Sequence, residues 1–135
     1  MFRPVAALII LILSVGTALA DTRLKRLDTG DDGRGWEAVG RLDIDGRGFC
    51  TGALIAPNLV LTAAHCVVTS SGTTLQAGQL FVALGSLDRT AANPAERLAV
   101  SSVRVHPGYR AVTFHNDLAL LQLASDSTTR PLDLA

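Results

Sequence analysis

One histidine of this 135-residue chain stands where it could act as a general base. His65 follows two apolar stretches, residues 48–55 and 59–62, and precedes Cys66. A second cysteine, Cys50, lies in the first stretch, so a bond between the two sulfurs would tie the turn that carries His65 back to the preceding strand. A general base must be held in a fixed place to take a proton. The pattern therefore indicates an immobilised imidazole suited to base chemistry.

One aspartate could orient that imidazole. Asp117 opens the apolar run 118–123. A carboxylate that accepts the imidazole N–H fixes the tautomer of the ring and stabilises the imidazolium that forms when the ring takes a proton. Taken alone, an aspartate in this place is typical of an ordinary turn at the start of a strand.

Residues 1–20 have the pattern of a secretory signal peptide. Arg3 gives the positive start, residues 5–15 are apolar apart from Ser14, and the small-x-small sequence at 18–20 predicts cleavage before Asp21. The alternative is an uncleaved membrane anchor, but the apolar stretch 5–20 has 16 residues, and a spanning helix needs about 20. We therefore expect a secreted or periplasmic protein that has no membrane contact after cleavage.

The two cysteines, Cys50 and Cys66, allow two kinds of site. An exported chain meets oxidising conditions, in which a disulfide persists. Such a bond would stabilise the fold by about 3 kcal/mol in the chain-entropy view of cross-links. The alternative is a zinc site made by both cysteines with two of His65, His106 and His115. That spacing matches no standard finger, and neighbouring residues are awkward tetrahedral ligands. The disulfide is favoured, and no metal is predicted.

The remaining pattern predicts many short strands. Residues 21–35 are rich in glycine and aspartate and predict a flexible leader or short propeptide. Apolar residues then recur in short runs between turn residues, which predicts strands at 36–43, 48–55, 59–62, 80–85, 97–105 and 118–123. Only residues 63–68 favour a helix, of little more than one turn. This organisation is typical of a small all-β barrel or sandwich.

Length and charge exclude several classes of protein. A chain of 135 residues suits one domain rather than two. Twelve basic residues balance twelve acidic ones, and 48% of the residues are hydrophobic. Such a chain is too apolar for a disordered polymer. It also lacks the basic stripe by which nucleic-acid-binding proteins neutralise phosphates, so no nucleic-acid partner is predicted.

Three segments resemble the trypsin-like, or chymotrypsin-like, serine proteases. The run Leu-Thr-Ala-Ala-His-Cys at 61–66 is similar, residue for residue, to the family's segment around the catalytic histidine. The run Asn-Asp-Leu-Ala-Leu-Leu at 116–121 resembles the segment of the aspartate that orients that histidine, with Leu118 in place of isoleucine. The run Val-Arg-Val-His-Pro-Gly-Tyr at 103–109 looks like the family's strand before the aspartate loop. The resemblance covers about residues 36–130.

The resemblance implies both a fold and a site. It makes His65 the general base and acid, Asp117 its orienting residue, and Cys50 and Cys66 a disulfide pair. It implies that residues 36–135 form a six-stranded antiparallel Greek-key β-barrel, the first of the family's two barrels and an incomplete peptidase domain.

The other two histidines receive no catalytic role from this resemblance. His106 falls in the segment whose histidine is not catalytic in the family, which implies a structural or surface role. His115 lies two residues before Asp117, where we expect an ordinary solvated loop residue.

The activity implied is hydrolysis of protein or peptide substrates by a Ser-His-Asp triad, without a cofactor. The family carries its serine in a Gly-Asp-Ser-Gly-Gly run of the second barrel, and this sequence contains no such run. We therefore expect a serine endopeptidase that is inactive without the missing carboxy-terminal barrel. The alternative is a non-catalytic, secreted single-barrel binding protein, in which the face toward the absent barrel would be an apolar docking surface.

Overall fold

The fold is seen in a computed structural model that describes residues 35–85 and 96–134. The predicted signal peptide, residues 1–20, lies outside the described residues, as does the predicted leader 21–35 apart from Gly35. Within the described residues, no helix is both long and apolar enough to cross a membrane.

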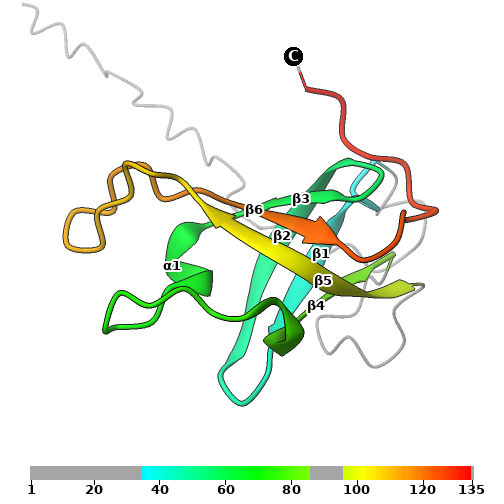
Figure 1. Ribbon diagram of the computed structural model, residues 1–135. Coiled ribbons are helices and arrows are strands. Elements are labelled where there is room, and N and C mark those ends of the chain that lie inside the picture. Colours follow the sequence, from blue (N-terminus) through cyan, green and yellow to red (C-terminus); the bar gives the residue numbers. More distant parts are fainter. Residues whose placement is uncertain (1–34, 86–95, 135) are drawn as a thin grey trace, which may run out of the picture.

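Six strands of the described residues form one closed antiparallel barrel (Figure 1). They pair in the order β1-β2-β3-β6-β5-β4, and β4 pairs with β1 to close the ring. Their bounds are β1 Val39–Ile44, β2 Gly48–Ala56, β3 Leu59–Thr62, β4 Leu80–Leu84, β5 Glu96–Val105 and β6 Ala119–Leu123. The predicted six-stranded antiparallel Greek-key barrel is therefore confirmed, and the sandwich is excluded.

The barrel encloses one apolar core because side chains alternate between its two faces. Along β6, for example, every second residue is buried, and the residues between them are partly exposed. Burial of apolar surface is the main favourable term in folding. The largest fully buried side chains, which come from five strands and α1, are Leu42, Leu54, Leu80, Leu84, Leu121, Val60, Val67 and Val82.

The turn between β1 and β2 forms where the Asp-Gly pair predicts one. Gly46 has a φ of +67°, a conformation that side chains with a Cβ rarely adopt. Arg47 N–H donates a hydrogen bond to the carbonyl of Ile44 at 3.0 Å, which closes the turn. This turn fixes the register in which Cys50 lies opposite Leu42.

The predicted element bounds differ from the structure in small ways. The first strand begins at Val39 rather than at 36, because Val39 N–H donates to the Trp36 carbonyl and closes a turn before the strand. The short helix is α1 Ala64–Val67, two residues shorter than predicted. A 3-10 helix, η1 Ala77–Gln79, was not predicted. None of these differences alters the order of the strands.

Candidate active site

The helix α1 presents His65 to solvent because its neighbours are anchored in the core. Ala64 and Val67, three residues apart, are both fully buried and fix the single turn of the helix. His65 falls between them, and 51% of its side chain is exposed. The strand before the helix is held as well, since the hydroxyl of Thr62 donates to the carbonyl of Thr51 at 2.8 Å.

A disulfide ties this helix to β2. Cys50 and Cys66 are bonded, with their Cα atoms 6.2 Å apart. The predicted disulfide is therefore confirmed. The zinc site weighed as its alternative is wrong, because both sulfurs are used in the bond and cannot act as thiolate ligands. Cys66 Sγ also lies 3.6 Å from Nε2 of His65.

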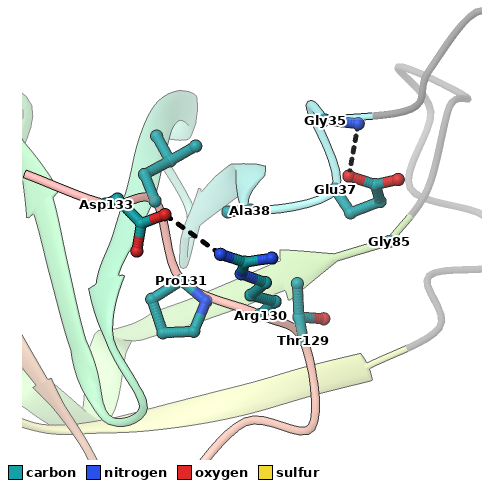
Figure 2. A pocket seen from close by; sticks show the side chains of 9 residues that line it. Gly35, Glu37, Ala38, Gly85, Thr129, Arg130, Pro131 and Asp133 are labelled. Carbon is teal, nitrogen blue, oxygen red and sulfur yellow. Dashed lines mark hydrogen bonds and ion pairs between the residues drawn. The ribbon is translucent and has the colours of Figure 1, made fainter.

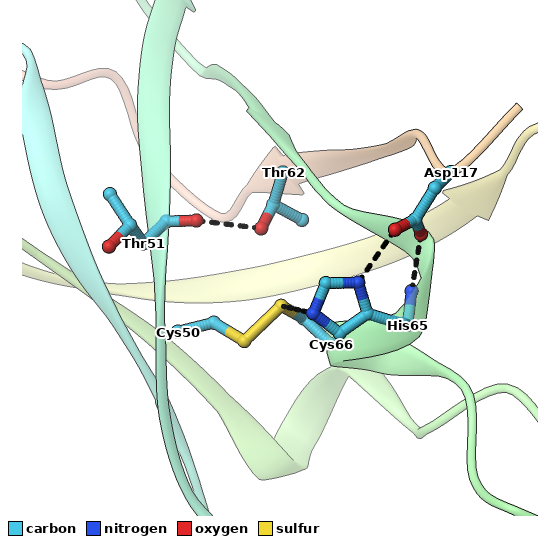
Figure 3. A network of polar contacts seen from close by, with 6 residues as sticks. All are labelled: Cys50, Thr51, Thr62, His65, Cys66 and Asp117. Atoms are coloured by element: carbon cyan, nitrogen blue, oxygen red, sulfur yellow. Dashed lines mark hydrogen bonds and ion pairs between the residues drawn. A yellow bond between two sulfur atoms is a disulfide. The ribbon is translucent and has the colours of Figure 1, made fainter. Parts of the chain in front are cut away.

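Asp117 accepts two hydrogen bonds from His65 (Figure 3). One carboxylate oxygen accepts a hydrogen bond from the backbone N–H of His65 at 2.8 Å, and the other accepts from ring Nδ1–H at 2.7 Å. The two residues are 52 positions apart in the sequence. Because a carboxylate only accepts hydrogen bonds, this contact fixes the proton on Nδ1 and leaves Nε2 as the acceptor nitrogen.

The electrostatics favour a charged Asp117. Partial burial alone would raise the pKa of this carboxyl group, but the hydrogen bonds from the ring and backbone of His65 and from the Ala64 backbone, with the charge of His65, lower it on balance. Asp117 therefore stays ionised through neutral pH. An ionised carboxylate on Nδ1 holds the ring in one orientation and one tautomer, as the residue that orients a general base must do.

Comparisons with known proteins agree with this geometry. A family model described as trypsin matches residues 30–135. The chain belongs to the trypsin family.

The relatives show how much of a trypsin-family protein this chain spans. Human serine protease 56 is 41% identical over 88 residues, which is 65% of this chain and 14% of the relative. Pig coagulation factor XII is 42% identical over 80 residues, 58% of this chain and 12% of the relative. The chain thus spans well under two thirds of these curated relatives. Among solved structures, the Vibrio cholerae VesB protease superposes with a TM-score of 0.61 and 28% identity, over 74% of this chain and 31% of that one.

A second solved structure shares the trypsin-family fold alone. A scabies mite inactivated protease paralogue superposes with a TM-score of 0.61 at 19% identity, over 70% of this chain and 37% of that one.

The loop that carries Asp117 also brings an aromatic ring to the histidine. Phe114 meets His65 edge-on, with the ring centres 5.9 Å apart and the planes at 88°. Its backbone φ of +53° is rare for a residue with a Cβ. Asn116, at +52°, stabilises the loop by donating from its side-chain amide to the Gly108 carbonyl at 3.0 Å. Sequence analysis did not find Phe114, whose only signal is its place three residues before Asp117.

The other two histidines are exposed and bonded locally. Nδ1 of His106 accepts a hydrogen bond from the Gly108 N–H at 3.0 Å. Nδ1 of His115 lies 3.0 Å from the Thr113 hydroxyl. The structure thus places His106 at the surface and His115 in a solvated loop, as predicted, and the ion pair with Asp117 is made by His65.

A second carboxylate, which sequence analysis missed, is more heavily bonded than Asp117. Glu96, at the start of β5, accepts hydrogen bonds from the hydroxyls of Ser127, Thr128 and Thr129 and from the Thr128 N–H. Partial burial alone would raise the pKa of Glu96, but these bonds together lower it from 4.5 to about 2. The sequence gives only a weak signal for this cluster, because the run Asp-Ser-Thr-Thr at 126–129 predicts nothing more than a polar loop.

One cavity of the described surface lies away from the histidine. A cavity of about 800 Å³ lies between residues 35–38, Gly85 and residues 129–133 (Figure 2). Four of its polar lining residues pair with one another: Arg130 pairs with Asp133 at 3.0 Å, and Gly35 N–H donates to Glu37 at 2.7 Å. His65 and Asp117 are not among its lining residues, so we place no catalytic role there.

Proposed function

We propose that this chain supplies the histidine and the aspartate of a secreted serine endopeptidase. The observation that carries the proposal is the pair of hydrogen bonds from His65 to Asp117, which fixes the ring and leaves Nε2 as the proton acceptor of a half-exposed side chain. A base used in catalysis needs this combination of a fixed ring and an accessible nitrogen. Membership of the trypsin family supports the same reaction.

In the proposed mechanism, Nε2 of His65 takes the proton of a serine hydroxyl as its oxygen attacks the scissile carbonyl of a peptide. Asp117 stabilises the imidazolium and holds its orientation. The same nitrogen then gives the proton to the departing amine. The serine and the donors that stabilise the oxyanion would come from the family's second barrel, which is the partner that this barrel requires. The reaction needs no metal or cofactor.

The proposal includes a route to the outside of the cell. Residues 1–20 would direct export and be removed, residues 21–35 would form a leader or short propeptide, and the barrel would begin at Trp36. The disulfide between Cys50 and Cys66 supports an oxidising compartment, secreted or periplasmic.

A second candidate is a single-barrel protein that binds a partner without catalysis. It is favoured by an apolar depression of about 240 Å³ on the outer surface of the barrel. The depression is lined by Leu61, Arg104, Val105, His106, Pro107, Leu118, Ala119 and Leu120. Exposed apolar surface of this kind often marks an interaction site.

One experiment separates the two candidates. The native exported product is purified, and its intact mass is measured with and without a serine-reactive fluorophosphonate. A mass larger than that of residues 21–135, with one adduct, supports the endopeptidase. Labelling should then disappear in His65→Ala and persist in the matched variant His106→Ala, since His106 is exposed and bonded only locally. A mass equal to residues 21–135 without an adduct supports the binding protein instead.

A further inference from the structure

A sulfur atom lies beside the nitrogen that Asp117 leaves open. A ring nitrogen of His65 and the sulfurs of Cys50 and Cys66 all lie within 4.8 Å of one another, and Nε2 lies 3.6 Å from Cys66 Sγ. Figure 3 shows the ring of His65 between the disulfide on one side and the carboxylate of Asp117 on the other. In the oxidised chain this sulfur is chemically silent, since it is bonded to its partner.

We propose that reduction of the disulfide turns Cys66 into a reactive thiol, activated by His65 and Asp117, that attacks soft electrophiles and the disulfides of small thiols. The arrangement has the three parts of an activated nucleophile: a group that attacks, a base within reach of it, and a third residue that orients the base. It makes the site a target for covalent modification. The proposal does not depend on the serine chemistry above.

The geometry does not need the disulfide to persist. Cys66 follows His65 directly in α1, so their nearness is local to one helical turn. That turn is also held by the buried side chains of Ala64 and Val67 and by the two hydrogen bonds from His65 to Asp117. After reduction these contacts hold the imidazole and the backbone of Cys66 on the same helical turn, so the freed thiol needs only a rotation about its own side-chain bonds to return to Nε2.

The electrostatics favour the thiolate. An imidazolium beside a thiol lowers the pKa of the thiol, because the two opposite charges stabilise each other. Asp117 lies on the far side of the ring, at 2.7 Å from Nδ1, and holds the ring with Nε2 toward the sulfur. His65 is exposed, and Cys66 is half-buried at the edge of the core, so the pair lies at the surface of the barrel.

The chemical steps balance. A dithiol such as dithiothreitol gives two electrons and two protons to the disulfide, becomes a cyclic disulfide itself, and leaves thiols at Cys50 and Cys66. The proton of Cys66 then passes to Nε2 of His65. With iodoacetamide, the thiolate forms a bond to the methylene carbon, the carbon–iodine bond breaks, and iodide leaves.

Two single substitutions provide matched thiols for the test. Cys50→Ser leaves Cys66 free beside His65, and Cys66→Ser leaves Cys50 free on β2. A third protein combines Cys50→Ser with His65→Asn, which removes the base but keeps a side chain of similar size. The rate of alkylation by iodoacetamide is measured by mass spectrometry from pH 5 to pH 9.

We expect Cys66 in the Cys50→Ser protein to react at pH 6 about tenfold faster than the thiols of the other two proteins, because a larger fraction is thiolate. Equal rates for the Cys50→Ser protein with and without His65→Asn, at every pH, would overturn the proposal. A faster reaction of Cys50 than of Cys66 would overturn it too.

Folding is checked by circular dichroism on each variant and on the native protein reduced with dithiothreitol. If Cys50→Ser unfolds, the reduced native protein is used, and alkylation is assigned to Cys50 or Cys66 by peptide mapping. If neither form keeps its β-sheet signal, the proposal is refuted, since the imidazole and the thiol are then not held together. Fluorophosphonate labelling of the oxidised protein is unaffected by any of these outcomes, so failure here is distinguishable from failure of the proposed endopeptidase.

Discussion

Two carboxylates at opposite ends of β5 are both held by hydrogen bonds, yet they are suited to different tasks. Glu96 begins the strand, and Asp117 lies beyond its other end, where Val105 pairs with Ala119. The pKa of each is lowered by donors that outweigh the effect of partial burial. What distinguishes them is the identity of the donors.

All the donors to Glu96 are hydroxyl or backbone groups of residues 127–129, which do not titrate near neutral pH. Such a carboxylate holds residues 127–129 against the barrel and has a structural role only. The side-chain donor to Asp117 is the ring of His65, whose second nitrogen, Nε2, carries no proton and whose side chain is half exposed. A carboxylate becomes chemically useful when its partner can itself exchange a proton, and the following predictions test this distinction.

The largest effect is expected for His65→Ala, which removes the proposed base. Hydrolysis of a peptide substrate by the native exported product should fall about 10⁴- to 10⁶-fold in kcat, because residues of a triad act as a unit. Steady-state kinetics measure the loss. His115→Ala is the control, since His115 is bonded only to its own loop. Activity within tenfold of the native value would remove His65 from the mechanism.

Asp117→Asn should have the next largest effect. An asparagine can donate to Nδ1, so the ring settles in the wrong tautomer, and kcat should fall by about 10⁴-fold, the size usually found for Ser-His-Asp triads. KM should change little, because Asp117 contacts His65 rather than a substrate. A rise in KM with kcat unchanged would contradict the orienting role.

Glu96→Gln should destabilise the fold by about 1–2 kcal/mol and leave kcat unchanged, because it weakens charge-assisted hydrogen bonds far from His65. Urea unfolding at neutral pH measures the difference. A kcat that falls with stability would show that the two ends of the barrel are coupled.

The difference in stability between the native protein and Glu96→Gln should depend on pH. The pKa of Glu96 is lowered from 4.5 to about 2 in the folded chain. Its stabilisation is therefore fully present above about pH 4.5 and is lost as the pH falls toward 2. The stability difference between native protein and Glu96→Gln should be constant from pH 5 to 7 and shrink below pH 4. A difference that stays constant down to pH 2 would contradict the lowered pKa.

The smallest effect is expected for Arg130→Ala. The pair of Arg130 with Asp133 is exposed, with 84% and 87% of the two side chains accessible to solvent. Exposed ion pairs contribute little because water screens them and their side chains lose freedom on pairing. Thermal unfolding should show no measurable change. A clear loss of stability would mean that exposure is a poor guide to the importance of a carboxylate in this chain.

The strands could be predicted from the sequence to within a few residues because each depends on local patterns. Alternating burial along β6 and the Asp-Gly turn before β2 are signals that neighbouring residues carry by themselves. The pairing of Cys50 with Cys66 was predicted for a similar reason, since an exported chain with two cysteines has few alternatives. The 3-10 helix η1 was missed because three residues give too short a pattern.

The Glu96 cluster and the contact of Phe114 with His65 could not be predicted. Glu96 meets residues 127–129 more than 30 positions away, and nothing in the local sequence of either segment points to the other. Phe114 reaches His65 only because two loop residues adopt positive φ angles that the sequence does not announce.

By itself, therefore, the sequence determined the all-β class, the positions of the strands and the residue types that could do chemistry, because these follow from short-range periodicity and motifs. Only the tertiary structure decided that Asp117 holds both the backbone and the ring of His65 across 52 positions, and that a sulfur of the disulfide lies beside the remaining nitrogen. The antiparallel pairing of β3 with β6 sets those distances, since it places Thr62, just before α1, opposite Ala119, just after Asp117.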